Sequence, residues 1–208
     1  MTHTLHREGD LQNLREDYVL ICYPTRGINS EGSNEKFRQI WEVVSHYGNR
    51  LANFGNMDNG TSLKIRLDDM IRSKKHRVVH AVFKDRETLK ACLQEIKDRD
   101  FGMSVVVSGL YDEVEKICRE IGLSPHTVNQ SLGVHGKKEN LPGKDVLEII
   151  TMCGHMMISK NLIAKMVKDI RKGKITPRDG AVEISKRCEC GIVNTDKAEN
   201  VLKKMAAL

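Results

Sequence analysis

The chain has 208 residues, of which 39% are hydrophobic and 30% are charged, and its formal net charge at pH 7 is +6. These values are ordinary for a soluble globular protein and argue against long disordered stretches. No apolar run approaches the roughly 20 residues that span a bilayer, and the first residues are too polar for a secretory signal. We therefore expect a cytoplasmic protein with no membrane association, whose cysteines stay reduced.

The charge is unevenly distributed along the chain. Residues 1–135 contain 19 Lys and Arg against 19 Asp and Glu, whereas residues 136–208 contain 15 against 9. The whole positive excess therefore falls in the C-terminal part. This asymmetry favours two domains, which we place at residues 1–123 and 124–208.

The N-terminal part alternates short apolar strands with amphipathic helices. Its pattern predicts strands at 17–23, 61–67, 76–83 and 103–107, helices at 34–47, 85–98 and 112–121, and a loop over the Asn- and Gly-rich residues 50–60. This order fits a ferredoxin-like α+β sandwich. If residues 61–67 are helical instead, a flavodoxin-like α/β arrangement becomes the better interpretation.

The C-terminal part is predicted to be mostly helical. A connecting stretch at residues 125–143 precedes it and has alternating apolar residues that suit a strand at 127–134. Three helix starts follow: Ser159 as an N-cap, Thr176 as an N-cap before Pro177, and Asn194 as an N-cap. The second of these helices should end at about Lys186.

Six cysteines are present, and periodicity assigns three of them to packing. Cys92 and Cys118 each occupy one position of an i, i+3, i+4, i+7 apolar helix face, and Cys22 lies inside an apolar strand run. Free cysteine in such positions usually acts as a small hydrophobic residue.

The other three cysteines lie in glycine-containing strings at helix junctions. Cys153 precedes Gly154 and His155, while Cys188 and Cys190 precede Gly191. Two antiparallel helices joined at Gly173 would bring the two strings together. Exposed helix amides and the neighbouring cations would stabilise thiolates there.

These strings suit a metal or iron-sulfur site. Cys153, Cys188, Cys190 and His155 would provide four ligands for tetrahedral zinc. The three thiolates alone would suit an iron-sulfur cluster with one exposed iron. A redox pair formed by Cys188 and Cys190, or turns with incidental cysteines, are the alternatives, because the spacing matches no standard zinc finger or ferredoxin motif.

Residues 24–34 form a second candidate site, because they link a predicted strand to a predicted helix. Gly27 and Gly32 have the four-residue gap of a phosphate-binding loop, but Ser33 stands where that loop carries Lys. An anion at these three residues is one interpretation, and an ordinary long connection is the other.

The basic C-terminal part also permits nucleic-acid binding. Its cations are interleaved with acidic residues, and Tyr and Phe are absent after Tyr111, so it offers no aromatic stacking platform. The alternative function is accordingly a cofactor-free binding module whose basic helices contact nucleic acid or an acidic protein.

The two cysteine strings resemble a CGH…CxCG pattern of uncharacterised proteins from anaerobic bacteria and archaea. The resemblance covers residues 124–205 and implies an anaerobic setting, which favours an iron-sulfur cluster over zinc. Our expectation is therefore a metal- or iron-sulfur-binding protein related to redox or one-carbon metabolism, with a protein redox partner. Neither catalysis nor an oligomeric state is predicted.

Overall fold

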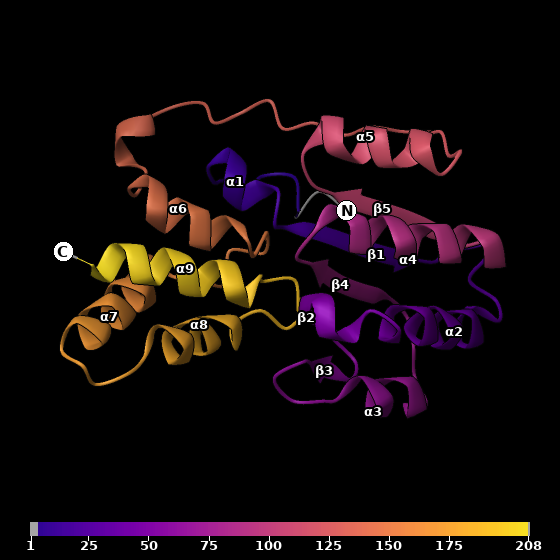
Figure 1. Ribbon diagram of the computed structural model, residues 1–208, viewed down its shortest axis with the longest axis horizontal. Helices are drawn as coiled ribbons and strands as arrows, with labels where there is room; N and C mark the ends of the chain where they lie inside the picture. The colour runs from indigo at the N-terminus through magenta and orange to yellow at the C-terminus, as the bar shows by residue number, and fades with distance from the viewer. Residues whose placement is uncertain (1–3, 208) are drawn as a thin grey trace. The chain divides into compact units, whose positions relative to one another are not determined.

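A computed structural model describes residues 4–207 and divides the chain into two compact units (Figure 1). The first, here called the sheet unit, contains Arg15–Pro125 and Glu189–Ile192. The second, the helical unit, contains Met1–Leu14, His126–Cys188 and Val193–Leu208, of which the first three residues and Leu208 lie outside the described part. The chain therefore crosses between the units at several points.

The sheet unit contains one five-stranded sheet in the order β3-β2-β4-β1-β5, with antiparallel pairing throughout. Its strands are β1 Tyr18–Tyr23, β2 Leu51–Asn56, β3 Gly60–Thr61, β4 Val79–Phe83 and β5 Ser104–Ser108. Its α-helices are α2 Ser33–Ser45, α3 Leu67–Arg72, α4 Arg86–Arg99 and α5 Tyr111–Glu120, and a short 3-10 helix, η1, spans Gly48–Arg50.

The strand order confirms an α+β fold and decides between the two predicted versions of it. Without the two-residue β3, the order β2-β4-β1-β5 with α2 and α4 as crossovers is the ferredoxin-like arrangement. A flavodoxin-like fold requires parallel pairing, whereas β1 pairs antiparallel with both of its neighbours.

The second strand does not lie where the sequence pattern places it. Residues 51–56, predicted as a loop, form β2, whereas residues 61–67 contribute only Thr61 to a strand before the chain turns into α3. The Asn side chains of β2 are used locally: Oδ1 of Asn56 accepts from the backbone N–H of Asp58 and Asn59, at 3.1 and 2.8 Å. Asn56, a residue type that is typical of turns, is thus the last residue of β2 and stabilises the turn that follows this strand.

The core of the sheet unit contains two of the three cysteines that were assigned to packing. Cys22 on β1 and Cys92 on α4 are fully buried in one cluster with Trp41. Cys118 on α5 is only half-buried, because Ile117 is the one residue of that helix that is fully buried. The packing interpretation is therefore confirmed for Cys22 and Cys92 and is only partly right for Cys118.

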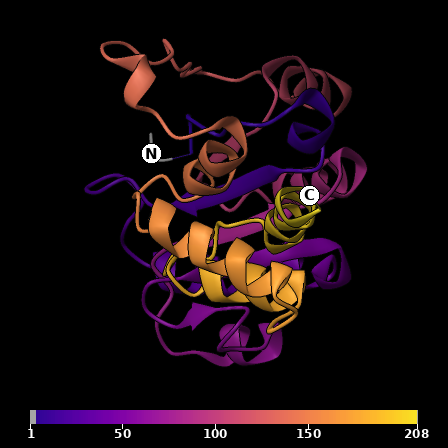
Figure 2. The same ribbon diagram turned by 90° about the vertical axis from the view of Figure 1, so that its left-hand side faces the viewer.

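The helical unit is built from short helices with well-formed caps. Its elements are α1 Leu11–Leu14, η2 Lys138–Asn140, α6 Lys144–Thr151, α7 Lys160–Arg171, α8 Pro177–Ser185 and α9 Thr195–Ala206, and α7, α8 and α9 pack against one another (Figure 2). The side chains of Ser159, Thr176 and Asn194 accept the backbone N–H bonds expected of N-caps. None of the helices within residues 4–207 is long and apolar enough to cross a membrane.

The connecting segment before α6 does not form the predicted strand. Residues 123–143 contain no strand and are almost entirely exposed, including Val128, Leu132 and Val134, whose alternation suggested one. Leu132 is 89% exposed. The alternation carries no structural information here, because the segment has no apolar face to pack against.

An N-terminal segment belongs to the helical unit through a buried polar cluster. The Lys197 ammonium donates to the carbonyl of Glu8 at 2.9 Å and lies 3.7 Å from the Glu148 carboxylate. Asn13 donates to the same carboxylate at 2.9 Å. Since a buried charge is costly unless it is paired, this cluster ties the segment to α6 and α9.

Candidate functional site: a buried thiol pair

The helical unit brings Cys153 and Cys188 together. Cys153 lies in the turn after α6, and Cys188 lies just after α8. The turn at Gly173, with φ +66°, reverses the chain between α7 and α8, which pack side by side. The sequence argument for juxtaposing the two strings therefore holds for these two cysteines.

The Cys153 sulfur accepts several hydrogen bonds although the residue is fully buried. The Cys188 thiol donates to it, and so do the backbone N–H groups of His155 and Met157. Met156 has a left-handed backbone with φ 57°, which curls the chain around the sulfur, and its N–H donates to the Cys153 carbonyl at 2.9 Å. A left-handed non-glycine residue is uncommon and marks a local constraint.

These donors set the protonation state of Cys153. The hydrogen bond from Cys188 and the two amide donors lower the pKa of the Cys153 thiol from 9.0 to about 6, with a further contribution from His155, although burial acts in the opposite direction. Hydrogen bonds made to the charged form favour that form. These donors therefore favour the thiolate of Cys153, which is the reactive form of cysteine.

Three cysteines of the sheet unit, Cys22, Cys92 and Cys118, have pKa shifts in the opposite direction. Burial raises the pKa of Cys22 to about 12 and raises that of Cys92 as well. The half-buried Cys118 also has a raised pKa, again mainly because of burial. These thiols stay protonated, so they are inert packing residues.

Cys190 belongs to the sheet unit, although it is only two residues from Cys188. Its carbonyl accepts a hydrogen bond from Nδ1 of His80 on β4, at 3.1 Å. Gly191 has φ +70°, and a Cβ there would meet the Phe54 carbonyl oxygen at 2.4 Å. The glycine of the second string is therefore explained by its close approach to β2.

The predicted fourth ligand, His155, is exposed, and its backbone N–H is one of the donors to Cys153. Within the described residues 4–207, no group of three or more His, Cys, Asp or Glu side chains is arranged to hold a metal ion. What the structure assembles is a pair of sulfur atoms surrounded by hydrogen-bond donors.

The loop at residues 24–34 is held by its own polar groups. The N–H of Thr25 donates to Oδ1 of Asn29 at 2.6 Å, and the N–H of Gly27 donates to Oγ of Ser30 at 3.3 Å. The hydroxyl of Ser33 donates to the carbonyl of Ser30, while Gly32 precedes α2 in a left-handed conformation. The backbone N–H groups of Thr25 and Gly27, which the phosphate-loop interpretation would offer to an anion, thus already donate to acceptors inside the loop.

Sequence reasoning missed the residue that shapes the thiol site. Met156 has neither the glycine nor the asparagine signature of a left-handed position, so no local signal reveals it. The nearby Gly154 points to a turn, but which amides face the sulfur depends on the tertiary arrangement.

Comparisons with family models, with curated proteins and with solved structures return no match to this chain. The fold and the site define the class of protein directly: an α+β protein with a ferredoxin-like sheet unit and a helical unit that contains a buried thiol pair.

Proposed function

We propose that the helical unit is a redox-responsive dithiol module, in which Cys153 is the nucleophile and Cys188 is the resolving thiol. The observation that carries the proposal is the hydrogen bond from the Cys188 thiol to a buried Cys153 sulfur that also receives two backbone amides. Dithiol chemistry needs only two sulfur atoms in contact, whereas a tetrahedral metal needs four ligands.

Burial restricts the oxidant to a small molecule. Cys153 and Cys188 are 0% and 2% exposed, so hydrogen peroxide fits the site better than a protein disulfide. The Cys153 thiolate attacks one peroxide oxygen, the O–O bond breaks, and a sulfenic acid and hydroxide form. Cys188 then attacks the sulfenic sulfur, an S–S bond replaces the S–O bond, and the hydroxyl leaves as water with the Cys188 proton. Together the two thiols are oxidised and the peroxide is reduced to two water molecules.

Peroxide titration of the reduced protein, followed by alkylation and peptide mass spectrometry, tests this function. We expect a disulfide between Cys153 and Cys188 and the loss of two hydrogens from the intact mass. Replacing Cys188 by Ser should stop the reaction at a sulfenic acid on Cys153, which dimedone traps.

The matched control is Cys118→Ser, which removes a half-buried thiol with a raised pKa and should leave the reaction unchanged. Oxidation of Cys118 while Cys153 stays reduced would contradict the proposal. So would a disulfide between Cys188 and Cys190 in place of the expected one.

The amide donors at Cys153 favour a second candidate function, binding of a soft metal ion at the same sulfurs. Thiolates in zinc and iron-sulfur sites are tuned by hydrogen bonds of this kind. Cys190 and His155 stay predicted ligands, and the anaerobic setting, one-carbon metabolism and a protein redox partner stay predictions with them.

Metal analysis and an absorbance spectrum of anaerobically purified protein distinguish the two candidates. Stoichiometric zinc or iron that is lost on replacing Cys153 by Ser, and kept on replacing Cys118 by Ser, would make metal binding the function of the pair. Metal well below one equivalent in all three proteins would leave the dithiol function standing.

A further inference from the structure

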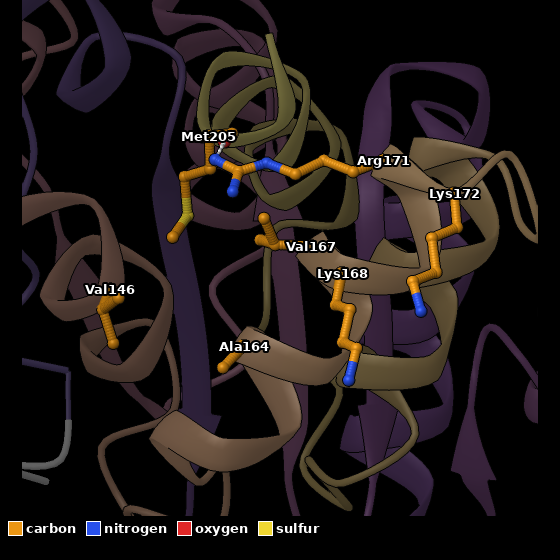
Figure 3. Close-up of a pocket in the computed structure, with 7 residues that line it drawn as sticks. All are labelled: Val146, Ala164, Val167, Lys168, Arg171, Lys172 and Met205. Carbon is orange, nitrogen blue, oxygen red and sulfur yellow. Dashed lines mark hydrogen bonds between the residues drawn. The ribbon is translucent and has the colours of Figure 1, made fainter. Parts of the chain in front are cut away.

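The helical unit contains a second feature that the thiol chemistry does not use, a pocket of about 480 Å³ (Figure 3). Its lining comes from α6, α7 and α9, namely Val146, Ala164, Val167, Lys168, Arg171, Lys172 and Met205. The volume falls within the range of small-molecule sites. Four of its side chains are apolar, and the other three are cations.

Two of the three cations differ from several other basic residues of this unit. Lys165, Arg178, Lys186, Arg187, Lys203 and Lys204 all have carboxylate partners at 3.4 Å or closer. The side chains of Lys168 and Lys172, by contrast, have no hydrogen-bond or ion-pair partner among residues 4–207, and both lysines are exposed. The pKa of Asp169 is lowered mainly by its hydrogen bond from Lys165, and the charge of the neighbouring Lys168 adds to this effect. Lys168 and Lys172 lie one helical turn apart and extend from α7 in a common direction (Figure 3).

Arg171 is fixed in place while keeping most of its donors. One of its terminal nitrogens donates to the Met205 carbonyl at 2.8 Å, which stretches the side chain from α7 to α9 across the pocket (Figure 3). A guanidinium has five N–H donors, so this bond leaves others for a ligand. An ordered Arg also loses less entropy when it binds an anion.

The helix dipole explains part of this arrangement. Cations near the C-terminus of α7 are stabilised by its carbonyl groups. The dipole does not, however, require a hollow lined by Val146, Val167 and Met205 beside those charges. An apolar floor next to unpaired cations is the pattern expected for an anion with an apolar body.

We propose that this pocket binds a small anionic amphiphile, an organic acid whose apolar body lies on Val146, Ala164, Val167 and Met205 and whose acidic group contacts Arg171. The lining lysines, Lys168 and Lys172, add positive charge to the site. The opposite charges of ligand and pocket favour this occupant over a neutral apolar molecule, which would leave the cations without counter-charges. The site is independent of the thiol pair, so the two proposals can fail separately.

Fluorescence titration with anilinonaphthalene sulfonate, an anionic amphiphile, tests the site, with decanoate and decanol as competitors. We expect one saturable site per chain, displaced by decanoate and much less by decanol. Reversing the charge of both lysines, in the double variant that combines Lys168→Glu and Lys172→Glu, should weaken probe binding about tenfold or more.

Two further variants separate charge from shape. Ala164→Trp should block the pocket without changing its charge, and exposure of Ala164 makes the substitution compatible with folding. Lys116→Glu, at an exposed position on α5 of the sheet unit, should leave binding unchanged and controls for general electrostatics. Circular dichroism should match the parent protein in each case.

Three results would overturn the proposal. Binding that is unchanged in both Ala164→Trp and the double lysine variant would place the probe elsewhere. Equal losses in the double variant and in Lys116→Glu would indicate a nonspecific charge effect. An acidic amphipathic peptide that displaces the probe more tightly than decanoate would identify a protein partner as the occupant instead.

Discussion

Cys92 in the sheet unit and Cys153 in the helical unit are both fully buried, yet the pKa values of their thiols are shifted in opposite directions. Cys92 is surrounded by apolar side chains, and burial raises its pKa. Cys153 receives a thiol and two amide hydrogen bonds, which lower its pKa to about 6. Burial by itself therefore does not decide whether a cysteine is inert, because the hydrogen-bond donors around the sulfur outweigh the cost of desolvation.

The largest expected effect on stability comes from a substitution beside Cys190, the third cysteine of the predicted metal site, which lies in the sheet unit. Gly191→Ala would drive a Cβ into the backbone of Phe54 at a positive φ, so we expect a loss of about 3 kcal/mol in the free energy of unfolding. Gly173→Ala is the matched control, since its φ is also positive but nothing lies within 4 Å of the added Cβ. Its expected loss is about 1 kcal/mol.

Urea unfolding of the two glycine variants measures this difference. Equal losses would mean that the close approach of Gly191 to β2 contributes nothing, and that Cys190 is not held in the sheet unit by its neighbour.

Serine substitutions compare the two cysteine environments directly. Cys92→Ser buries a hydroxyl among apolar side chains, so it should lower the free energy of unfolding by about 2 kcal/mol. Cys188→Ser keeps a donor for the Cys153 sulfur, so its loss should stay below about 1 kcal/mol. Denaturant titration at neutral pH under reducing conditions gives both values, and the reverse ranking would contradict the contrast between the units.

The pH dependence of the thiolate provides the smallest but most specific test. Ultraviolet thiolate absorbance of the parent protein should rise with a midpoint near pH 6. Cys188→Ala removes the strongest donor and should move that midpoint upward, while Cys188→Ser should largely preserve it. A midpoint that is unaffected by Cys188→Ala would show that Cys188 does not set the pKa of Cys153.

The same shift has a consequence for stability. Because the folded-state pKa of Cys153 lies below its ordinary value of 9.0, the thiolate stabilises the folded protein fully above pH 9.0, and this contribution is lost as the pH falls through about 6. The stability difference between the parent and Cys153→Ala should therefore grow from pH 5 toward pH 9. A difference that stays constant over this range would contradict the lowered pKa.

Local patterns correctly predicted three N-caps, the helices α2, α4, α5, α7, α8 and α9, and the burial of two core cysteines. Ser159, Thr176 and Asn194 are identifiable because a cap bonds within three residues of itself. The strand β2 was missed for the opposite reason, since its Asn and Gly residues are typical of turns and only pairing with β4 makes it a strand. Alternation at Val128, Leu132 and Val134 failed likewise, because no sheet receives that segment.

For the candidate site, the sequence by itself pointed to Cys153 and Cys188 and to a turn at Gly173 that brings them together. Only the tertiary structure decided that Cys190 belongs to the sheet unit and that the amides of His155 and Met157 face the Cys153 sulfur. The physical reason is range: periodicity and capping act between neighbours along the chain. The pKa of a buried thiol, in contrast, depends on donors that folding brings from separate segments.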